Sequence, residues 1–583
     1  KNNIFSGGME TSWGARIERK LQEQYLAVQL EKNSGLNKEE TKKTIITNYL
    51  NTINLGSNTL GVKVAARRYF NKEVSDLTLA ECTVLASITS NPSRYNPITN
   101  PENNNTRRQI VLQNMVDQNY ISKQDMENAL SDDVYDRIQN VNTAAKETNS
   151  HYSYFTDELI EQVTEALMKK LGYTESQASN LVYSGGLKIY TTQDPKIQAI
   201  VDEEVNDPGN YTVAKYSVEY RLSVNHADGT TQHYSEENLR AYRKNTLGDT
   251  SFEGLYNSKE EVQADIDRYK EWLLKDGDDV IAERQNLILQ PQASFFIMDQ
   301  HTGEVKALSG GRGEKTASRT LNRATNVYRQ PGSSFKVLTA FAPAIDTCGA
   351  TLGTVYYDAP YTIGTKTFRN WWGESRGFTG YSNIREGIIY SMNIVAVKTI
   401  TDVTPTVAID YLLRFGFTSL QLEGANSDYG QALALGGLTN GVSNLELTAA
   451  YAGIANGGAY NSPKMYSKVV DNDGNVILDN TVSEPTQVIS EQNAWLLIDC
   501  MKDVVTGAGG TSSAAKISNM TTAGKSGTTS ENRDVWFVGM SPYYTAGIWV
   551  GYDNNGYKHE LSSKAGETSF HKKLWSKVMS RIH

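Results

Sequence analysis

Apolar residues recur at helical spacing through the first 145 residues. In "RIERKLQEQYLAVQLEK", Ile17, Leu21, Tyr25 and Val28 fall on one face of a predicted helix. Further helices are predicted in "TKKTIITNYLNTINLG", "LTLAECTVLASIT", "TRRQIVLQNMVDQNYIS" and "SKQDMENALS", with turn sequences such as "NPSRYNP" between them. We therefore expect an all-α lobe over residues 1–145.

The pattern changes near residue 183, where "GGLKIYTTQDPKIQ" alternates like a strand and its Asp-Pro then starts a helix. Residues 205–290 are polar and irregular, with one clear helix in "SKEEVQADIDRYKEWLLK". Ser258 and Glu261 are spaced as a capping box at its start. We expect residues 146–290 to form a linker or accessory module, in which residues 205–290 are a structural insert rather than a partner site.

Strand patterns return from residue 291 to residue 583. "ASFFIMDQHTGEVKALSGG" predicts a hairpin, and "MTTAGKSGTT", "RDVWFVGMSP" and "YTAGIWVGYD" predict three short strands. "SFHKKLWSKVMSRIH" predicts a closing helix. Strands, then helices, then strands indicate an antiparallel sheet with helices packed on it, so the fold class is α+β and multidomain.

Composition narrows the possible functions. The chain has 583 residues, 39% hydrophobic and 21% charged, as in a globular protein of several domains. Its formal charge of -9 gives no support for nucleic-acid binding. Cys82, Cys348 and Cys500 are too widely separated for a zinc motif, and we expect neither a metal nor a cofactor. No run of about 18 apolar residues is present. The opening "KNNIFSGG" resembles the middle of a longer protein, so the lack of an apolar run is not evidence that the protein is cytosolic.

The stretch "RQPGSSFKVLTA" contains a candidate nucleophile. A serine hydroxyl needs a base within about 2.6–3.2 Å to become reactive. If "SSFKVLTAFAPAI" is a helix, Ser333 shares a face with Lys336, three residues on, whereas Ser334 does not. Pro-Gly before Ser333 would place it in the first turn, where unpaired N–H groups favour negative charge.

The pattern S-x-x-K is weak evidence alone. Ser513–Lys516 and Ser569–Lys572 repeat it, and chance explains any one copy about as well as function does. The pattern gains meaning when an S-x-N motif and a K-T-G motif accompany it, because the three together form a serine acyl-enzyme site.

Both partner motifs follow Ser333 in order. Ser391-Met-Asn393 precedes an apolar helix, and "AGKSGTT" supplies Lys525 on a predicted strand. A turn with a solvated lysine would also explain Lys-Ser-Gly, but three partners in order make coincidence improbable. The other S-x-N copies fall outside the interval between the S-x-x-K and Lys-Ser-Gly motifs; they are Ser223-Val-Asn225 and Ser530-Glu-Asn532.

These motifs resemble those of the class A penicillin-binding proteins, which are bifunctional peptidoglycan synthases. "QPGSSFKVLTAFAPAID" resembles the family's nucleophile helix, and "ALGGLTNGVSNLELTAAYAGIANGGAY" resembles the segment that leads to its lysine strand. "GKSGTTSENRDVWFVGMSPYYTAGIWVGYDN" is similar to the family's sheet sequence, with Ser526 where Thr is common. The resemblance implies a serine β-lactamase-like transpeptidase domain over residues 291–583.

The resemblance also implies roles. Ser333 would attack a D-Ala-D-Ala stem peptide, and Lys336, its pKa lowered by burial and by Lys525, would accept the proton. Ser391 would relay a proton to the leaving amine, and Asn393 would hold Lys336 and the substrate amide. The N–H groups of Ser333 and Thr528 would form an oxyanion hole. The substrate-binding residues implied by the family are Lys525, Ser526, Gly527, Thr528 and Thr529.

The helical lobe resembles the family's lysozyme-like glycosyltransferase domain. "RKLQE" resembles its third motif, "KKTIITNYLNTINLG" its fourth, and "GVKVAARRYFNKEVSDLTLAECTVLASITSNPSRYNP" its fifth and the continuation. By this match Glu23 would be the second carboxylate, with Arg19 and Lys20 facing lipid-linked pyrophosphate. A charged helix face with pairing between Arg19 and Glu23 is the plainer interpretation of "RKLQE" alone.

The family's first acidic motif and its Gln-Gln motif lie upstream of these residues and are not found here. We therefore expect a truncated lobe without glycan polymerisation, and a membrane anchor outside this chain. The expected partners are stem peptides and β-lactams, with lipid II in the full-length protein, at the extracytoplasmic face of a bacterial membrane. The alternatives are a D,D-carboxypeptidase or β-lactamase, and a catalytically silent scaffold or β-lactam sensor.

Overall fold

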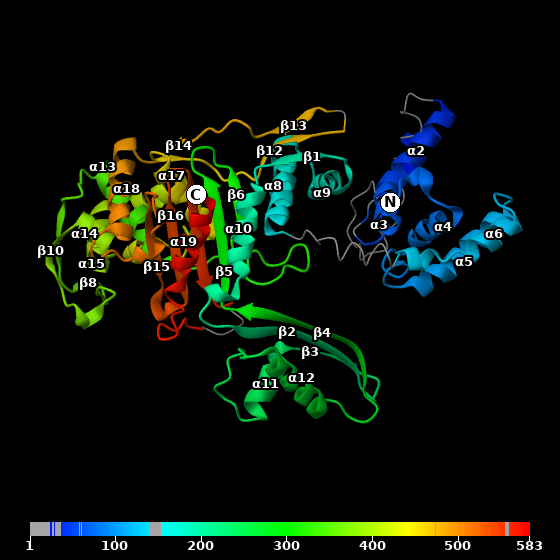
Figure 1. Cartoon of the computed structure of the whole chain (residues 1–583), viewed down its shortest axis with the longest axis horizontal. Coiled ribbons are helices and arrows are strands. Elements are labelled where there is room, and N and C mark those ends of the chain that lie inside the picture. The colour runs from blue at the N-terminus through cyan, green and yellow to red at the C-terminus, as the bar shows by residue number, and fades with distance from the viewer. Residues whose placement is uncertain are drawn as a thin grey trace. The chain divides into compact units, whose positions relative to one another are not determined.

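The computed structural model describes residues 24–25, 28–29, 37–57, 59, 61–138, 153–472, 474–553 and 559–583. The chain forms two compact units (Figure 1). The first comprises the described parts of residues 1–151, 160–189 and 469–478. The second comprises the described parts of residues 152–159, 190–468 and 479–583.

Helices joined by loops and turns make up the described part of the N-terminal lobe, as predicted. Its apolar side chains form one core that includes Leu55, Tyr69, Val84 and Leu112. The predicted helix over "RIERKLQEQYLAVQLEK" lies mostly outside the described residues. The helices are α2 (Lys38–Thr52), α3 (Val62–Phe70), α4 (Leu79–Ile88), α5 (Pro101–Asp117) and α6 (Lys123–Leu130).

The next segment confirms the predicted strand and helix start. Strand β1 (Lys188–Thr191) precedes α10 (Pro195–Asn206). Asp194 caps α10 by accepting hydrogen bonds from the N–H groups of its first turn, and Pro195 has no N–H that would need an acceptor. Helices α8 (Tyr154–Leu171) and α9 (Glu175–Ser184) come before them.

The prediction of an irregular segment with one helix over residues 205–290 is wrong. This segment forms a three-stranded antiparallel sheet of order β3-β2-β4 with α11 and α12 against it (Figure 1). Every second residue of β2, from Val218 to Val224, enters a separate core, whereas β4 is largely exposed and reads as polar. The elements are β2 (Lys215–Asn225), β3 (Thr231–Ser235), α11 (Glu236–Asn245), α12 (Lys259–Leu273) and β4 (Asp279–Gln290).

The predicted capping box at the start of α12 is half formed. The Ser258 hydroxyl accepts a hydrogen bond from the N–H of Glu261 at 3.1 Å. The Glu261 carboxylate instead accepts from the N–H of Asn257 at 2.9 Å. The helix prediction itself is confirmed.

The C-terminal part is built on a five-stranded sheet of order β15-β16-β17-β5-β6, in which every neighbour is antiparallel. The predicted hairpin and the three predicted C-terminal strands are confirmed. The strands are β5 (Gln292–Asp299), β6 (Val305–Ser309), β15 (Ala523–Thr528), β16 (Asp534–Met540) and β17 (Tyr544–Gly551).

Helices cover both faces of this sheet (Figure 1). In β16, Val535 and Phe537 enter the core under α10 and α19, whereas Trp536 and Val538 enter the core that α17 and α18 share. This alternation explains why β16 is apolar throughout, since both of its faces are buried. The helices are α17 (Asn444–Ala455), α18 (Glu491–Thr506) and α19 (Phe570–Ile582), the last being the predicted closing helix.

Most of the remaining elements belong to the second unit, whereas β12 and β13 fall partly within residues 469–478 of the first. Strands β7 and β10 pair, and β8 and β9 form a hairpin. None of the helices in the described ranges is both long and apolar enough to cross a bilayer. The remaining helices and strands are α13 (Ala342–Thr347), α14 (Ile384–Ile389), α15 (Asn393–Val403), α16 (Pro405–Arg414), β7 (Val355–Asp358), β8 (Tyr361–Ile363), β9 (Lys366–Phe368), β10 (Gly380–Asn383), β11 (Ala459–Tyr460), β12 (Tyr466–Val470), β13 (Val476–Asp479) and β14 (Thr486–Gln487).

Candidate active site

The predicted nucleophile helix is present but changes its winding. A 3₁₀ turn at Gly332–Ser334 leads into a π-helical stretch at Val337–Phe341 and then into α13. Pro343 lacks the N–H that an α-helix would donate to Thr339, so the regular ladder is interrupted there. Single π turns inside helices often mark functional sites.

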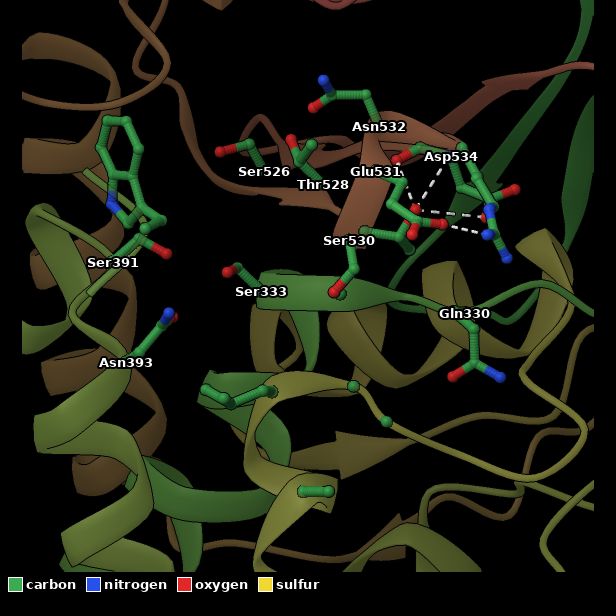
Figure 2. A pocket seen from close by; sticks show the side chains of 18 of the residues that line it. Gln330, Ser333, Ser391, Asn393, Ser526, Thr528, Ser530, Glu531, Asn532 and Asp534 are labelled. Atoms are coloured by element: carbon green, nitrogen blue, oxygen red, sulfur yellow. Dashed lines mark hydrogen bonds and ion pairs between the residues drawn. The ribbon is translucent and has the colours of Figure 1, made fainter. Parts of the chain in front are cut away.

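The two adjacent serines have different environments. Ser334 is fully buried, and its hydroxyl donates a hydrogen bond to the carbonyl oxygen of Pro331 at 2.7 Å. Ser333 is partly exposed and lines a pocket, into which its hydroxyl points (Figure 2). Within the part of the chain that the structure describes, the Ser333 hydroxyl makes no hydrogen bond. Ser334 is therefore a structural residue, and Ser333 is available to a ligand.

Lys336, three residues after Ser333, is fully buried. Its nitrogen donates hydrogen bonds to Asn393 Oδ1 at 2.7 Å, to the Ser391 carbonyl oxygen at 2.6 Å and to Ser391 Oγ at 3.2 Å. Burial, followed by the charge of Lys525, lowers the pKa of Lys336 well below its ordinary value. A lysine in these surroundings can serve as a base near neutral pH.

Lys525 approaches the same hydroxyl from strand β15. Its nitrogen donates a hydrogen bond to Ser391 Oγ at 2.9 Å and another to the Ser526 carbonyl oxygen at 3.1 Å. Burial, followed by the charge of Lys572, lowers the pKa of Lys525 to about 7. The Ser391 hydroxyl thus connects two buried lysines.

The Ser391–Asn393 segment is held by residues that the sequence analysis did not identify. Asn370 Oδ1 accepts hydrogen bonds from the N–H groups of Asn393 at 2.9 Å and Ile394 at 3.3 Å. Asp358 fixes Asn370 in turn by accepting from its amide at 2.8 Å. Ser391 itself has a φ of +54°, a conformation that is costly for a non-glycine residue. No sequence pattern marks Asn370, because it lies in an irregular loop.

Two glycines bring the nucleophile turn against the lysine strand. A Cβ at Gly527 would lie 2.2 Å from the carbonyl oxygen of Pro331. A Cβ at Gly332, whose φ is +56°, would lie 2.6 Å from the carbonyl oxygen of Thr528. Both contacts exclude any larger residue, so the Gly of each motif sets the distance between Ser333 and β15.

The pocket joins the three motifs. Its volume is about 1030 Å³, and Ser391 and Asn393 face Ser333 from one side while Ser526 and Thr528 lie on another (Figure 2). The predicted residue Thr529 also lines it. Sequence reasoning missed several other lining residues; they include Trp371, Thr511, Ser563, Thr568 and Lys572.

The repeated motifs do not form a second site of this kind in the described residues. Ser513 and Lys516 are exposed in a short 3₁₀ turn. Ser223 forms a cross-strand hydrogen bond with His233, 2.8 Å away, on the accessory sheet. Of the Ser569–Lys572 copy, Lys572 lines the pocket. Ser530 and Asn532 also line it (Figure 2).

Comparisons with known proteins identify related domains, sequences and structures. The family profile described as "Penicillin binding protein transpeptidase domain" matches residues 293–578, and the profile described as "Transglycosylase" matches residues 3–116. Penicillin-binding protein 1A of Clostridium perfringens (strain 13 / Type A) is 32% identical over 582 residues, which cover 97% of this chain and 74% of that protein. The chain belongs to the class A penicillin-binding proteins.

Other relatives show how much of a class A penicillin-binding protein is present. Penicillin-binding protein 1A of Clostridium botulinum (strain Langeland / NCTC 10281 / Type F) is 33% identical over 596 residues, covering 100% of this chain but 61% of that protein. The chain thus spans about three-fifths of such a relative. The crystal structure of penicillin-binding protein 1A from Haemophilus influenzae, 22% identical, has the same fold, with a TM-score of 0.59 over 94% of this chain and 86% of that one. The expected α+β multidomain class is confirmed.

The glycosyltransferase expectations have a mixed outcome. Arg19, Lys20 and Glu23 lie outside the described residues, so their roles stay predictions. The match of the transglycosylase profile to residues 3–116 shows that this domain is represented in the chain. The expected absence of glycosyltransferase activity is not confirmed.

Proposed function

We propose that residues 291–583 form a serine D,D-transpeptidase that cross-links peptidoglycan stem peptides through an acyl-enzyme on Ser333. The convergence of Lys336 and Lys525 on the Ser391 hydroxyl, beside a pocket into which Ser333 points, carries this proposal. Residues 1–145 and 146–290 would be the glycosyltransferase-like lobe and the accessory module.

The first step is acylation. Ser333 Oγ attacks the carbonyl carbon of the penultimate D-Ala, and Lys336 accepts the serine proton. The N–H groups of Ser333 and Thr528 would donate to the developing oxyanion, where loss of one donor commonly costs about 10²–10³ in rate. The peptide bond then breaks, and the terminal D-Ala leaves as an amine after it receives a proton through Ser391.

The second step transfers the acyl group. The amine of a neighbouring stem peptide attacks the ester carbon, loses a proton to Lys336 and displaces Ser333 Oγ, which regains its proton. A new amide bond then links the two strands. Asn393 would hold Lys336 in place and accept the substrate amide N–H.

Strand β15 would bind the donor peptide. Lys525 and the hydroxyls of Ser526, Thr528 and Thr529 are suited to the terminal carboxylate, because charge-assisted hydrogen bonds to a carboxylate are strong. Gly527 would let the peptide backbone approach the strand. A β-lactam presents a similar carboxylate beside a reactive carbonyl and would acylate Ser333.

The whole protein would act at the extracytoplasmic face of a bacterial membrane. Its helical lobe would take lipid II as the substrate for glycan polymerisation, with Glu23, Arg19 and Lys20 near the pyrophosphate. Cell-wall synthesis then joins glycan growth and cross-linking in one protein.

A donor–acceptor assay tests the proposal. The protein is incubated with a D-Ala-D-Ala pentapeptide and an amine acceptor, and the products are followed by mass spectrometry. We expect a cross-linked product that needs Ser333. Free tetrapeptide alone would instead support a carboxypeptidase. Rapid hydrolysis of penicillin would support a β-lactamase, and no turnover of the pentapeptide or of penicillin would support a silent scaffold.

A further inference from the structure

One end of the pocket is formed by a lysine that belongs to none of the three motifs. Lys572 lies in the first turn of α19, and its nitrogen donates a hydrogen bond to the carbonyl oxygen of Thr511 at 2.8 Å. Thr511, Ser563 and Thr568 line the same pocket, so hydroxyl-bearing residues share its wall with the lysine.

Two lysines, Lys572 in the pocket wall and Lys525 on β15, have no carboxylate paired to either among the described residues, and burial lowers the pKa of both. Lys572 is close enough for its charge to lower the pKa of Lys525. Of the acidic residues that line the pocket, Glu531 pairs with Arg533, and Asp534 accepts a hydrogen bond from Trp549.

Two buried hydroxyl groups in the segment that Lys572 contacts also lack hydrogen-bond partners among the described residues. The buried Oγ atoms of Thr511 and of its neighbour Ser512 have no hydrogen-bond partner within the described parts of the chain. Unpaired buried hydroxyls are uncommon in folded proteins, and a ligand or water group often explains them. Cations and hydroxyl groups together are the usual setting for an anionic ligand.

We propose that Lys572 is a specificity-determining residue that binds the terminal carboxylate of the donor peptide together with Ser526 and Thr528. The proposal rests on the function proposed above, because that function places a carboxylate-ended peptide along β15. Lys525 contacts the Ser391 hydroxyl, so Lys572 supplies a second cation whose task is recognition alone. A free carboxylate would therefore be preferred to a neutral end group.

A pair of thioester probes tests the proposal. One probe is the thioester of N-benzoyl-D-alanine with thioglycolate, which ends in a carboxylate, and the other is its methyl ester. In each, Ser333 Oγ forms an ester with the alanyl carbonyl, the C–S bond breaks, and the serine proton ends on the released thiol. Thiol release gives the second-order rate constant for both probes on the same protein sample.

The variants are Lys572→Gln, Lys572→Arg and the control Lys573→Gln, which removes the same charge from the exposed neighbour. We expect K572Q to slow the carboxylate probe about tenfold or more, the size of a lost charged contact. The ester probe should change less than about twofold, since it never had that contact. K572R should restore most of the loss, and K573Q should behave as the unchanged protein.

The ratio of the two rates distinguishes the outcomes, because incomplete folding lowers both rates equally and leaves the ratio unchanged. An unchanged ratio in K572Q would overturn the role of Lys572 and leave the proposed function standing. If the unchanged protein reacts with neither probe, or if Ser333→Ala still reacts, the proposed function itself fails and this inference with it.

Discussion

The side-chain nitrogen of Lys525 lies 2.9 Å from the hydroxyl oxygen of Ser391. The same oxygen accepts a hydrogen bond from Lys336 at 3.2 Å, so one hydroxyl connects lysines from two different elements. Both lysines are buried and have lowered pKa values. In the proposed mechanism, this arrangement would give a proton a short route between Lys336 and the side of the pocket where the leaving amine would lie.

Removing the Ser391 hydroxyl should break that route. We expect Ser391→Ala to slow acylation by a fluorescent penicillin by about 10²–10⁴, the range for loss of a general acid or base. Ser530→Ala is the matched control, because Ser530 also lines the pocket and starts an S-x-N triplet. Equal rates for S391A and S530A would contradict the proton route.

The pH dependence of acylation should follow the two lysines. Lys336 must be neutral to accept a proton, so the rate should fall as the pH drops below the lowered pKa of this lysine. Lys525 must be charged to bind a carboxylate, so the rate for a carboxylate ligand should also fall as the pH rises through about 7. A bell-shaped profile is expected in stopped-flow measurements.

The variant Lys525→Arg separates the two limbs of that profile. Arginine stays protonated to beyond about pH 12, so the alkaline fall should disappear while the acid fall remains. An alkaline fall that persists unchanged in K525R would assign it to another group.

The close approach at Gly527 gives a packing prediction. In Gly527→Ala the new methyl would meet the Pro331 carbonyl oxygen, and we expect a loss of about 1–3 kcal/mol in unfolding free energy together with slower acylation. Gly430→Ala is the control, because its Cβ would meet nothing within 4 Å. Equal urea denaturation midpoints for the two variants would contradict the close contact.

Asn370 offers a test of how the Ser391–Asn393 segment is held. Asn370→Ala leaves two N–H groups at the start of α15 without their acceptor, which should cost about 0.5–2 kcal/mol, as for other helix caps. Acylation should slow as well, because Asn393 loses its anchor. Asn286→Ala, on the exposed strand β4, should change neither quantity. Wild-type acylation in N370A would show that the cap does not position the site.

Motif order predicted which residues meet at the pocket, because several of them lie on or beside helices and strands. Lys525 lies on a strand, and Ser391 and Asn393 lie at the start of a helix, so the order of the motifs was enough to bring them together. The strands of the main sheet could also be predicted from the sequence, since their residues alternate between two buried faces.

Other features depend on contacts that no local pattern contains. Lys572 and Thr511 reach the pocket from segments far from the three motifs, and Asn370 acts from an irregular loop. The sequence analysis missed the accessory sheet because β4 is exposed over most of its length and has a polar sequence. The alternation in β2 alone was not enough to predict a sheet. Tertiary packing determines whether such a segment forms a strand, and the periodicity of the sequence alone does not predict that packing.

Intact-protein mass spectrometry after incubation with penicillin tests the central claim, that Ser333 is the nucleophile, most directly. The account predicts a long-lived adduct of one penicillin mass on the unchanged protein and on Ser334→Ala and Ser513→Ala. Ser333→Ala should carry no adduct. An adduct that persists in Ser333→Ala would contradict the assignment of the nucleophile. If that adduct is lost in Ser334→Ala or Ser513→Ala instead, the replaced serine would be the nucleophile.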